Sequence, residues 1–162
     1  MRILAIDPGN LYSAYCLIDT DTMKPLQFDK TENAIVRSAL EQKEQYDHAV
    51  IEMIAHYGTG MPAGKSVFDT CVWIGRFMET AERQGRTIDT VMRRDEKLDL
   101  CGSMKAKDSN ITQALIDRFA PNTPNRGKGR KNQPGFFYGF HADIWQAYAV
   151  GVTYIDQISG RR

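Results

Sequence analysis

Three acidic residues lie at positions where a carboxylate could take part in catalysis. Asp7 ends the apolar run ILAID, Glu52 interrupts the apolar run HAVIEMIA, and Asp143 opens the apolar segment DIWQAYAVGV. A carboxylate that is removed from water is strongly destabilised unless a cation or a set of hydrogen bonds compensates it. Three carboxylates brought together would repel one another, and such hard oxygen ligands select Mg²⁺ or Mn²⁺. The sequence therefore predicts a divalent-metal site formed by these three residues.

Each of these residues also has an ordinary structural interpretation when it is taken alone. Glu52 could lie on the open face of an edge strand, and Asp7 could end a strand before the Pro8-Gly9 turn. Asp143 could simply favour the positive end of a helix dipole. The metal site is favoured because the three carboxylates are considered jointly.

An alternation of strands and helices is predicted to position these residues. Apolar runs predict strands at residues 3–7, 12–19, 26–28, 48–55 and 87–94, the first two joined by the turn Pro8-Gly9-Asn10. Helical spacing and end signals predict helices at residues 31–46, 66–85, 108–119 (capped by Asp108 or Ser109) and 143–158. Strands that come first as hairpins and then alternate with helices favour an α/β fold, with a mixed five-stranded sheet and helices on both faces.

The composition is that of an average folded domain. The chain has 162 residues, of which 42% are hydrophobic and 25% are charged, so it is long enough to bury a core as one domain over residues 1–162. Cys16, Cys71 and Cys101 are far apart without a CxxC pair, which argues against a disulfide framework and a zinc cluster and suggests the reducing cytoplasm. No apolar stretch reaches the ~18 residues that span a bilayer, so no membrane partner is expected.

The net charge of +1 hides an acidic first half and a basic second half. Residues 1–80 carry 7 basic and 11 acidic side chains, whereas residues 81–162 carry 14 and 9. Four basic residues lie in the segment RGKGRKNQPG, whose glycines and proline exclude a helix or a central strand: Arg126, Lys128, Arg130 and Lys131. This segment is either a solvated loop or a flexible basic arm that binds nucleic-acid phosphates.

Four segments of the chain resemble the successive blocks of RuvC-type Holliday junction resolvases, especially the phage-borne branch. They are ILAIDPGNLYSAYCLID, VIEMIAHYGTGMPAGKSVFDTCVWIGRFME, LCGSMKAKDSNITQALIDRF and HADIWQAYAVGVTY, and together they cover most of the chain. The resemblance implies an RNase H-like fold in which Asp7, Glu52 and Asp143 hold two Mg²⁺ ions, with Mn²⁺ as a substitute, and activate water for attack on a phosphodiester. It also implies a cytoplasmic homodimer, in a bacterial or phage-infected host, that cuts two strands of a four-way DNA junction.

Two features of the chain differ from the pattern of the cellular members of this family. Gln146 stands where these members have a fourth carboxylate, and His141 lies two residues before Asp143. Gln146 shares a helical face with Asp143, so both Gln146 and His141 are candidate metal ligands, although His141 could be an ordinary helix-entry residue. The family's lysine before the penultimate helix is also shifted, and Lys105 and Lys107 are the candidates for contact with the DNA phosphate.

The glycine-rich loop GTGMPAGKS has the position but not the spacing of a nucleotide-binding P-loop. A Walker A motif needs four residues between its first glycine and the final GKS, and the chain has Thr59 where that glycine would stand. No nucleoside triphosphate is therefore expected. In the resolvase interpretation Tyr57 stacks on an unpaired base and Lys65 contacts the DNA, although Tyr57 could equally pack within the loop.

Other functions fit the same residues. The chain could be an RNase H-like nuclease that acts on another branched DNA or RNA, or a junction-binding module that does not cut. Sugar kinases and actin-like ATPases open with a similar strand and turn, but they need two such domains to enclose ATP, and 162 residues supply one. Magnesium-dependent cutting would separate an enzyme from a binding module.

Overall fold

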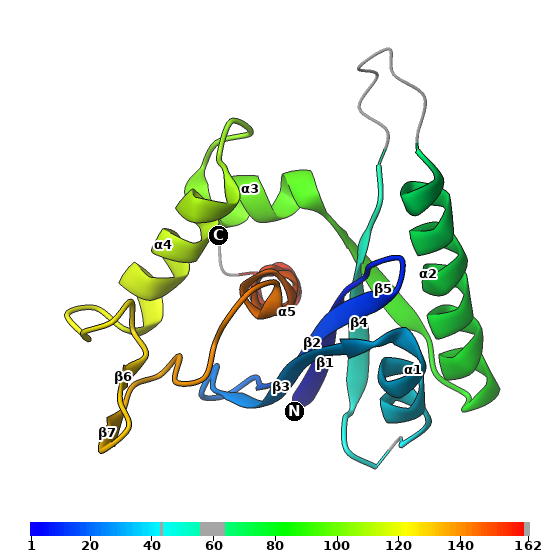
Figure 1. Cartoon of the computed structure of the whole chain (residues 1–162), viewed down its shortest axis with the longest axis horizontal. Coiled ribbons are helices and arrows are strands. Elements are labelled where there is room, and N and C mark those ends of the chain that lie inside the picture. Colours follow the sequence, from blue (N-terminus) through cyan, green and yellow to red (C-terminus); the bar gives the residue numbers. More distant parts are fainter. Residues whose placement is uncertain (43, 56–63, 161–162) are drawn as a thin grey trace.

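A mixed sheet forms the centre of the computed structural model, which describes residues 1–42, 44–55 and 64–160. The strand order is β3-β2-β1-β4-β5, with β1, β2 and β3 antiparallel in succession and β4 and β5 parallel to β1 (Figure 1). The strands are β1 (Arg2–Asp7), β2 (Tyr12–Asp19), β3 (Pro25–Glu32), β4 (His48–Met53) and β5 (Ile88–Met92). The predicted α/β fold with a five-stranded mixed sheet is confirmed.

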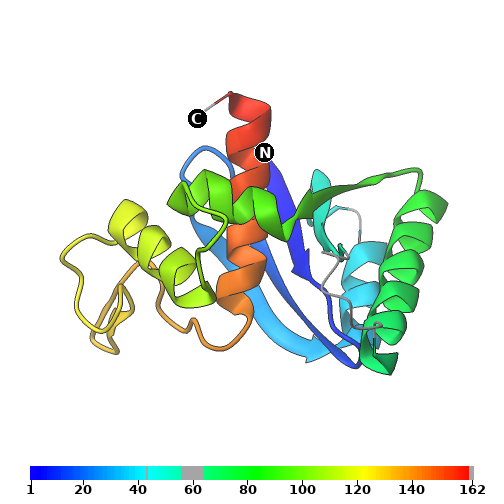
Figure 2. The same ribbon diagram turned by 90° about the horizontal axis from the view of Figure 1, so that it is seen from above.

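Helices cover both faces of this sheet, as the sequence predicts. The helices are α1 (Asn33–Glu41), α2 (Lys65–Arg83), α3 (Arg93–Cys101), α4 (Asp108–Phe119) and α5 (Ile144–Ser159). α1 and α2 cover one face, whereas α5 packs on the other face with α3 and α4 on its outer side (Figures 1 and 2). Because side chains alternate along a strand, Ile3 and Ala5 of β1 join the core under α5, and Leu4 and Ile6 join the core under α1 and α2.

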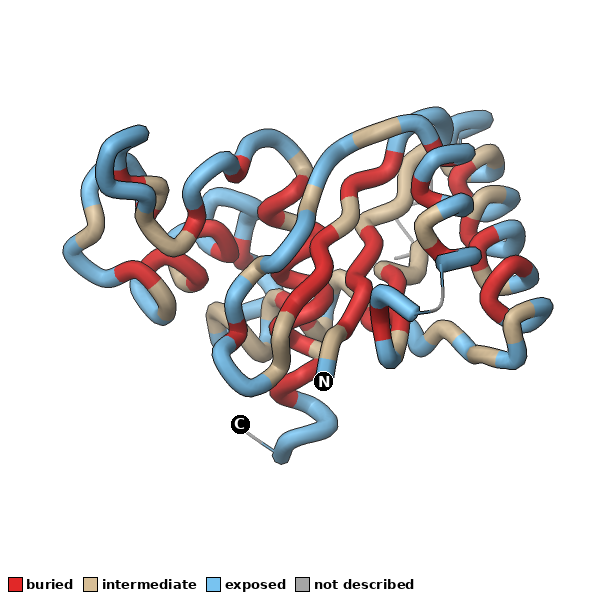
Figure 3. Tube along the Cα trace, turned by 90° about the horizontal axis from the view of Figure 1, so that it is seen from below, coloured by how far each residue is buried: buried red, intermediate tan, exposed pale blue. Residues whose placement is uncertain are grey.

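α5 is buried along most of its length because it lies between the sheet and the pair of helices α3 and α4 (Figure 3). A Cβ atom at Gly151 would lie 2.3 Å from Ile18 Cδ1 and 3.0 Å from Ala5 Cβ, so a glycine is needed for this close approach to β1 and β2. Arg118 of α4 donates a 2.8 Å hydrogen bond to Asp156 of α5, which joins the two helices. No helix within the described ranges combines the length and apolar character needed to cross a membrane.

A small hairpin lies outside the main sheet. It consists of β6 (Gly129–Arg130) and β7 (Gln133–Pro134), and it projects from the corner of the molecule beyond α4 (Figure 1). Backbone hydrogen bonds close its base, including one of 2.8 Å from the Gly135 N–H to the Lys128 carbonyl. The segment RGKGRKNQPG is thus neither a helix nor a central strand, as predicted, and it has a defined backbone structure.

The first helix is shorter than the sequence predicts. It ends at Glu41 rather than near Tyr46, and its buried stripe consists of Asn33, Val36 and Leu40. The chain then turns, and the buried Tyr46 hydroxyl donates a 2.7 Å hydrogen bond to the Leu40 carbonyl. Tyr46 therefore reaches the core through a turn and not as a further position on the helix.

The region after β5 also differs from the prediction. The strand expected to reach residue 94 ends at Met92, and Arg93 opens a helix, α3, that the sequence did not reveal. Glu96 is the one buried residue of α3. The sequence of this helix therefore lacks apolar residues at helical spacing, the pattern from which a helix is predicted. Lys107, rather than Asp108 or Ser109, occupies the N-cap position of α4, and its backbone N–H donates a 2.8 Å hydrogen bond to Asn110 Oδ1.

Candidate active site

Asp7 and Glu52 lie beside each other at the carboxyl ends of two parallel strands. The register of β1 and β4 pairs Ile6 with Ile51, so the next residues, Asp7 and Glu52, point to the same face of the sheet. This is the face that α5 covers, because Ala5, two residues before Asp7, belongs to the core under α5. The two carboxyl groups are close enough for each to affect the pKa of the other.

Asp143 joins these two residues from the start of α5. It is the N-cap residue of this helix, and its carboxylate acts electrostatically on Asp7. The structure therefore brings together the three carboxylates that the sequence singles out. As they stand, however, no three His, Cys, Asp or Glu side chains in the described part of the chain are arranged to hold one metal ion.

Burial and mutual repulsion dominate the electrostatics of this group. Burial raises the pKa of Asp7 well above its ordinary value, and the nearby Glu52 and Asp143 carboxylates raise it further. Burial also raises the pKa of Glu52, against the opposing effect of the Arg93 guanidinium. The site therefore carries more negative charge than its protein neighbours compensate, and a proton or a cation would relieve the repulsion.

Arg93, the first residue of α3, is the main basic partner of the site. Its Nη1 atom lies 2.6 Å from Glu96 Oε2 and 3.8 Å from Glu52 Oε2. Its Nη2 atom donates hydrogen bonds to Asp108 of α4 and, at 3.2 Å, to Gln146 of α5. Arg93 thus joins β4, α3, α4 and α5 at one end of the sheet, where Figure 2 shows α4 and α5 both beginning.

Glu96 is a further carboxylate of this site that sequence reasoning missed. The residue is fully buried, and its Oε1 atom has no hydrogen-bond partner among the described residues. Burial, with a contribution from the Glu52 carboxylate, raises the pKa of Glu96 to about 9. No sequence signal distinguishes this glutamate, because it lies in the charged run RRDEKLDLC.

Lys30 is a second basic residue that sequence reasoning missed. It projects from β3 and forms an ion pair with Asp143, which lies 113 positions later in the chain. The Lys30 side chain is 36% exposed and that of Asp143 is 48% exposed. This pair is therefore open to water, unlike the buried pair of Arg93 and Glu96.

The two candidates for a fourth metal ligand have different surroundings. The Gln146 Oε1 atom accepts the hydrogen bond from Arg93, so it lies inside the polar cluster. His141 is exposed, and its Nδ1 atom is 3.0 Å from the Gly139 carbonyl oxygen. The role of each as a ligand stays a prediction.

The candidate DNA-binding residues fall into separate groups. Lys105 and Lys107 are exposed in the connection between α3 and α4, and Lys107 directly precedes Asp108, the partner of Arg93. Lys65 opens α2 and pairs with Asp69, while Tyr57 lies outside the described residues. The remaining four lie on or beside the projecting hairpin: Arg126, Lys128, Arg130 and Lys131. Lys107 is thus adjacent in the chain to a partner of Arg93, whereas the hairpin residues lie at an outer corner of the molecule (Figure 1).

The donor set fits a divalent cation. Asp7, Glu52 and Asp143 offer carboxylate oxygens, the ligands that Mg²⁺ and Mn²⁺ prefer. The pKa of Asp7 is raised by burial and further by repulsion from Glu52 and Asp143, and a divalent cation would offset both effects. The unpartnered Glu96 Oε1 atom shows that the buried acidic groups exceed the available donors.

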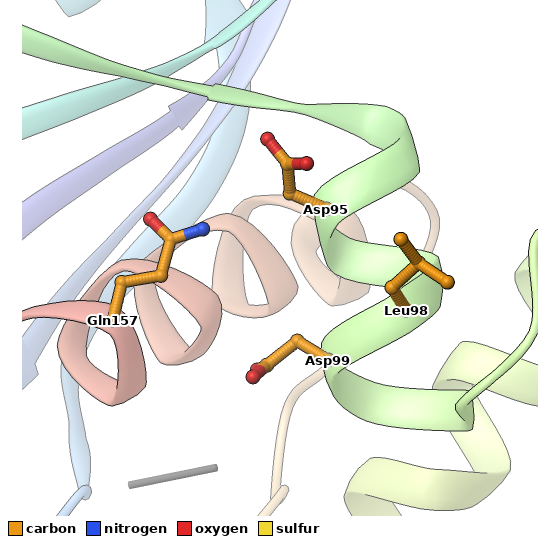
Figure 4. A pocket seen from close by; sticks show the side chains of 4 residues that line it. All are labelled: Asp95, Leu98, Asp99 and Gln157. Atoms are coloured by element: carbon orange, nitrogen blue, oxygen red, sulfur yellow. The ribbon is translucent and has the colours of Figure 1, made fainter. Parts of the chain in front are cut away.

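A surface pocket lies elsewhere, between α3 and the carboxyl-terminal half of α5. Asp95, Leu98, Asp99 and Gln157 line it (Figure 4). At the usual rise per residue, Gln157 lies roughly 20 Å further along the axis of α5 than Asp143. The pocket is therefore separate from the carboxylate site, and none of its lining residues within the described part of the chain is basic.

Comparisons with known proteins identify the fold. No protein-family model and no curated protein matches the sequence. The chain is similar to the structure of RuvC from Thermus thermophilus, with a TM-score of 0.69 and 13% identity over 99% of this chain and 97% of that chain. It is also similar to T. thermophilus RuvC in complex with a Holliday junction substrate, with a TM-score of 0.70 and 10% identity over 99% and 96% of the two chains. The RuvC-like, RNase H-like fold that the sequence suggests is confirmed.

Proposed function

We propose that this chain is a divalent-metal-dependent endonuclease that cuts branched DNA, with the four-way (Holliday) junction as its preferred substrate. The observation that carries this proposal is the partly buried pair of carboxyl groups, Asp7 and Glu52, at the ends of neighbouring parallel strands. The fold supports it, because it is similar to that of a RuvC whose structure holds a Holliday junction substrate.

Asp7, Glu52 and Asp143 would hold Mg²⁺, with Mn²⁺ as a substitute. A divalent cation at this position lowers the pKa of a bound water and neutralises charge on a phosphodiester. The protein positions the carboxylates on rigid elements, two strand ends and a helix start, so that the geometry of the centre does not depend on a loop.

Basic residues around the site would bind the DNA backbone. Lys107 directly precedes Asp108, the partner of Arg93, and Lys105 lies two residues earlier. Lys65, at the start of α2, and Tyr57, which lies outside the described residues, would contact the branch point. The hairpin basic residues would contact a more distant phosphate run, because the hairpin lies at an outer corner. Phosphate contacts of this kind supply affinity and orientation rather than sequence preference.

Two copies of the chain would form the working enzyme, because a four-way junction presents two equivalent strands. Phe68 and Val72, which are 62% and 53% exposed, lie four residues apart on α2 and present an apolar surface that a second copy would cover. In sedimentation analysis we expect a dimer that Phe68→Glu converts to a monomer, whereas Leu26→Glu, a change at a similarly exposed apolar residue on β3, leaves it intact. A wild-type chain that is monomeric at tens of micromolar would contradict the dimer.

The decisive experiment is incubation of the chain with a synthetic four-way junction, with and without Mg²⁺. We expect paired nicks only with the metal, and we expect Asp7→Asn and Glu52→Gln to abolish cutting while binding is retained or improved. Asp21→Asn, at a carboxylate that is 84% exposed, is the matched control. Metal-independent binding without cutting would favour a junction-binding module, and faster cutting of flaps or branched RNA would favour a different substrate.

A further inference from the structure

Arg93 lies where a second cation would be needed to balance Glu52. We propose that Arg93 replaces that second ion, so that Asp7, Glu52 and Asp143 hold one divalent cation instead of the two that the family resemblance implies. The inference rests on the proposed function, because it concerns the same metal centre.

Arg93 is held in a fixed position. Its guanidinium group contacts Glu52, Glu96, Asp108 and Gln146, and only 18% of its side chain is exposed. If Arg93 swung out into solvent, the fully buried Glu96 would lose the one side-chain donor that contacts it within the described ranges. Arg93 is therefore expected to stay beside Glu52 when a cation binds.

Arg93 already engages one oxygen atom of each of its three other neighbours on this side of Glu52. Gln146 and Asp108 accept hydrogen bonds from Arg93 Nη2, and Glu96 Oε2 accepts one from Nη1. Gln146 is also uncharged, so the α5 position where the cellular members of the family carry a fourth carboxylate adds no negative charge here. A second divalent cation would have to compete with the guanidinium for every one of these ligands.

Charge repulsion acts in the same direction. A guanidinium stays protonated across the whole pH range of a protein, so Arg93 is a permanent positive charge. Its distance of 3.8 Å from Glu52 is short enough to offset much of that carboxylate's charge. A divalent ion on the same side of Glu52 would be repelled by Arg93 and attracted less strongly by Glu52.

Lys30 provides the contrast. It pairs with one partly exposed carboxylate, Asp143, and its flexible side chain is itself 36% exposed. Lys30 can therefore move into water when a cation takes its place at Asp143, whereas Arg93 cannot move without disrupting the core. The single cation is expected on the side of the site that Lys30 leaves.

The test is a count of bound ions on the full chain, without DNA. Mn²⁺ is titrated into the metal-free protein, and free Mn²⁺ is followed by its electron paramagnetic resonance signal together with calorimetry. We expect one ion per wild-type chain and one per Arg93→Lys chain, which keeps the positive charge. Arg93→Gln should bind two, whereas Lys30→Gln should bind one with an affinity several-fold higher than that of the wild type.

Each outcome separates this inference from the proposed function. Two ions of similar affinity on the wild-type chain would overturn the inference and leave the proposed nuclease intact. A wild-type chain that binds no Mn²⁺ would overturn both. The number of Mn²⁺ ions bound per wild-type chain is sufficient to test the inference. The test therefore stands even if Arg93→Gln does not fold, which circular dichroism would reveal.

Discussion

At the scale of single residues, the buried acids of the site make the stability of the metal-free chain depend on pH. Burial raises the pKa of Asp7, Glu52 and Glu96, so the folded chain retains protons that the unfolded chain releases. The stabilising contribution of such a group is fully present below its unfolded pKa and is lost as the pH rises through its folded pKa. The metal-free chain should therefore lose stability from these groups as the pH increases.

Glu96 provides the sharpest prediction of this kind. Its pKa is about 9 in the folded chain and near 4.5 in the unfolded chain, so its contribution declines between these values. Glu96→Gln cannot release a proton, and its side-chain oxygen can still accept the bond from Arg93. In EDTA, we expect the melting temperature of Glu96→Gln to rise relative to that of the wild type between pH 5 and pH 9.

The control is Glu79→Gln, which changes a glutamate whose side chain is 55% exposed. Its melting temperature should follow that of the wild type throughout. Melting temperatures of wild type and Glu96→Gln that run parallel from pH 5 to pH 9 would show that Glu96 does not retain its proton in the folded chain.

At the scale of secondary-structure elements, the projecting hairpin allows DNA affinity to be tested separately from catalysis. The four basic residues on or beside the hairpin are Arg126, Lys128, Arg130 and Lys131. Their replacement by alanine changes neither the carboxylates nor the core. If each contacts a phosphate, each loss removes about one unit from the slope of log affinity against log salt. We expect a shallower slope in binding titrations with a four-way junction. Alanine at Arg37 and Arg83, on α1 and α2, should leave the slope unchanged, and an unchanged slope in the hairpin variant would identify a solvated loop.

Two glycines in helices should respond in opposite ways to alanine. At Gly151 in α5, a Cβ atom would lie 2.3 Å from Ile18 Cδ1, so Gly151→Ala should destabilise the chain by about 1–3 kcal/mol. At Gly75 in α2, a Cβ atom would meet nothing within 4 Å, so Gly75→Ala should stabilise it by about 0.5–1 kcal/mol. Chemical denaturation measures the free energy of unfolding of both variants. Equal stability of Gly151→Ala and wild type would mean that α5 shifts from the sheet without cost.

At the scale of the whole molecule, the site joins elements from distant parts of the chain. The carboxylates and their basic partners come from β1, β3, β4, α3, α4 and α5, which pack around one end of the sheet. Repulsion among the acids therefore opposes the packing of most of the fold. A bound cation should relieve this repulsion and stabilise the molecule as a unit.

We therefore expect Mg²⁺ to raise the melting temperature of the entire chain. A ligand at 100 times its dissociation constant adds about 2.7 kcal/mol to the free energy of unfolding. Protons compete with the metal for Asp7 and Glu52, whose pKa values are raised, so the effect should be larger at pH 8 than at pH 5. Calorimetry should show the shift in Asp21→Asn but not in Asp7→Asn. The absence of any shift with either Mg²⁺ or Mn²⁺ at pH 8 would argue against a metal centre.

Local patterns in the sequence were sufficient to predict the sheet and the three carboxylates. The runs ILAID and HAVIEMIA predict strands because apolar side chains must be buried, and the Pro8-Gly9-Asn10 turn marks the first hairpin. Asp7 and Glu52 are noticeable because charge is unusual in such runs. Each of these sequence patterns spans only a few neighbouring residues, so it can be recognised without knowledge of the fold.

The basic partners of the site and its one fully buried acid, Glu96, were decided by tertiary structure alone. Lys30 meets Asp143 across 113 positions, and Arg93 meets Gln146 across 53. α3 escaped detection because it buries a glutamate, Glu96, where a typical helix buries an apolar residue. A buried ion pair replaces apolar contact only where several elements converge to enclose it, and that convergence depends on how the sheet and α3, α4 and α5 pack in three dimensions.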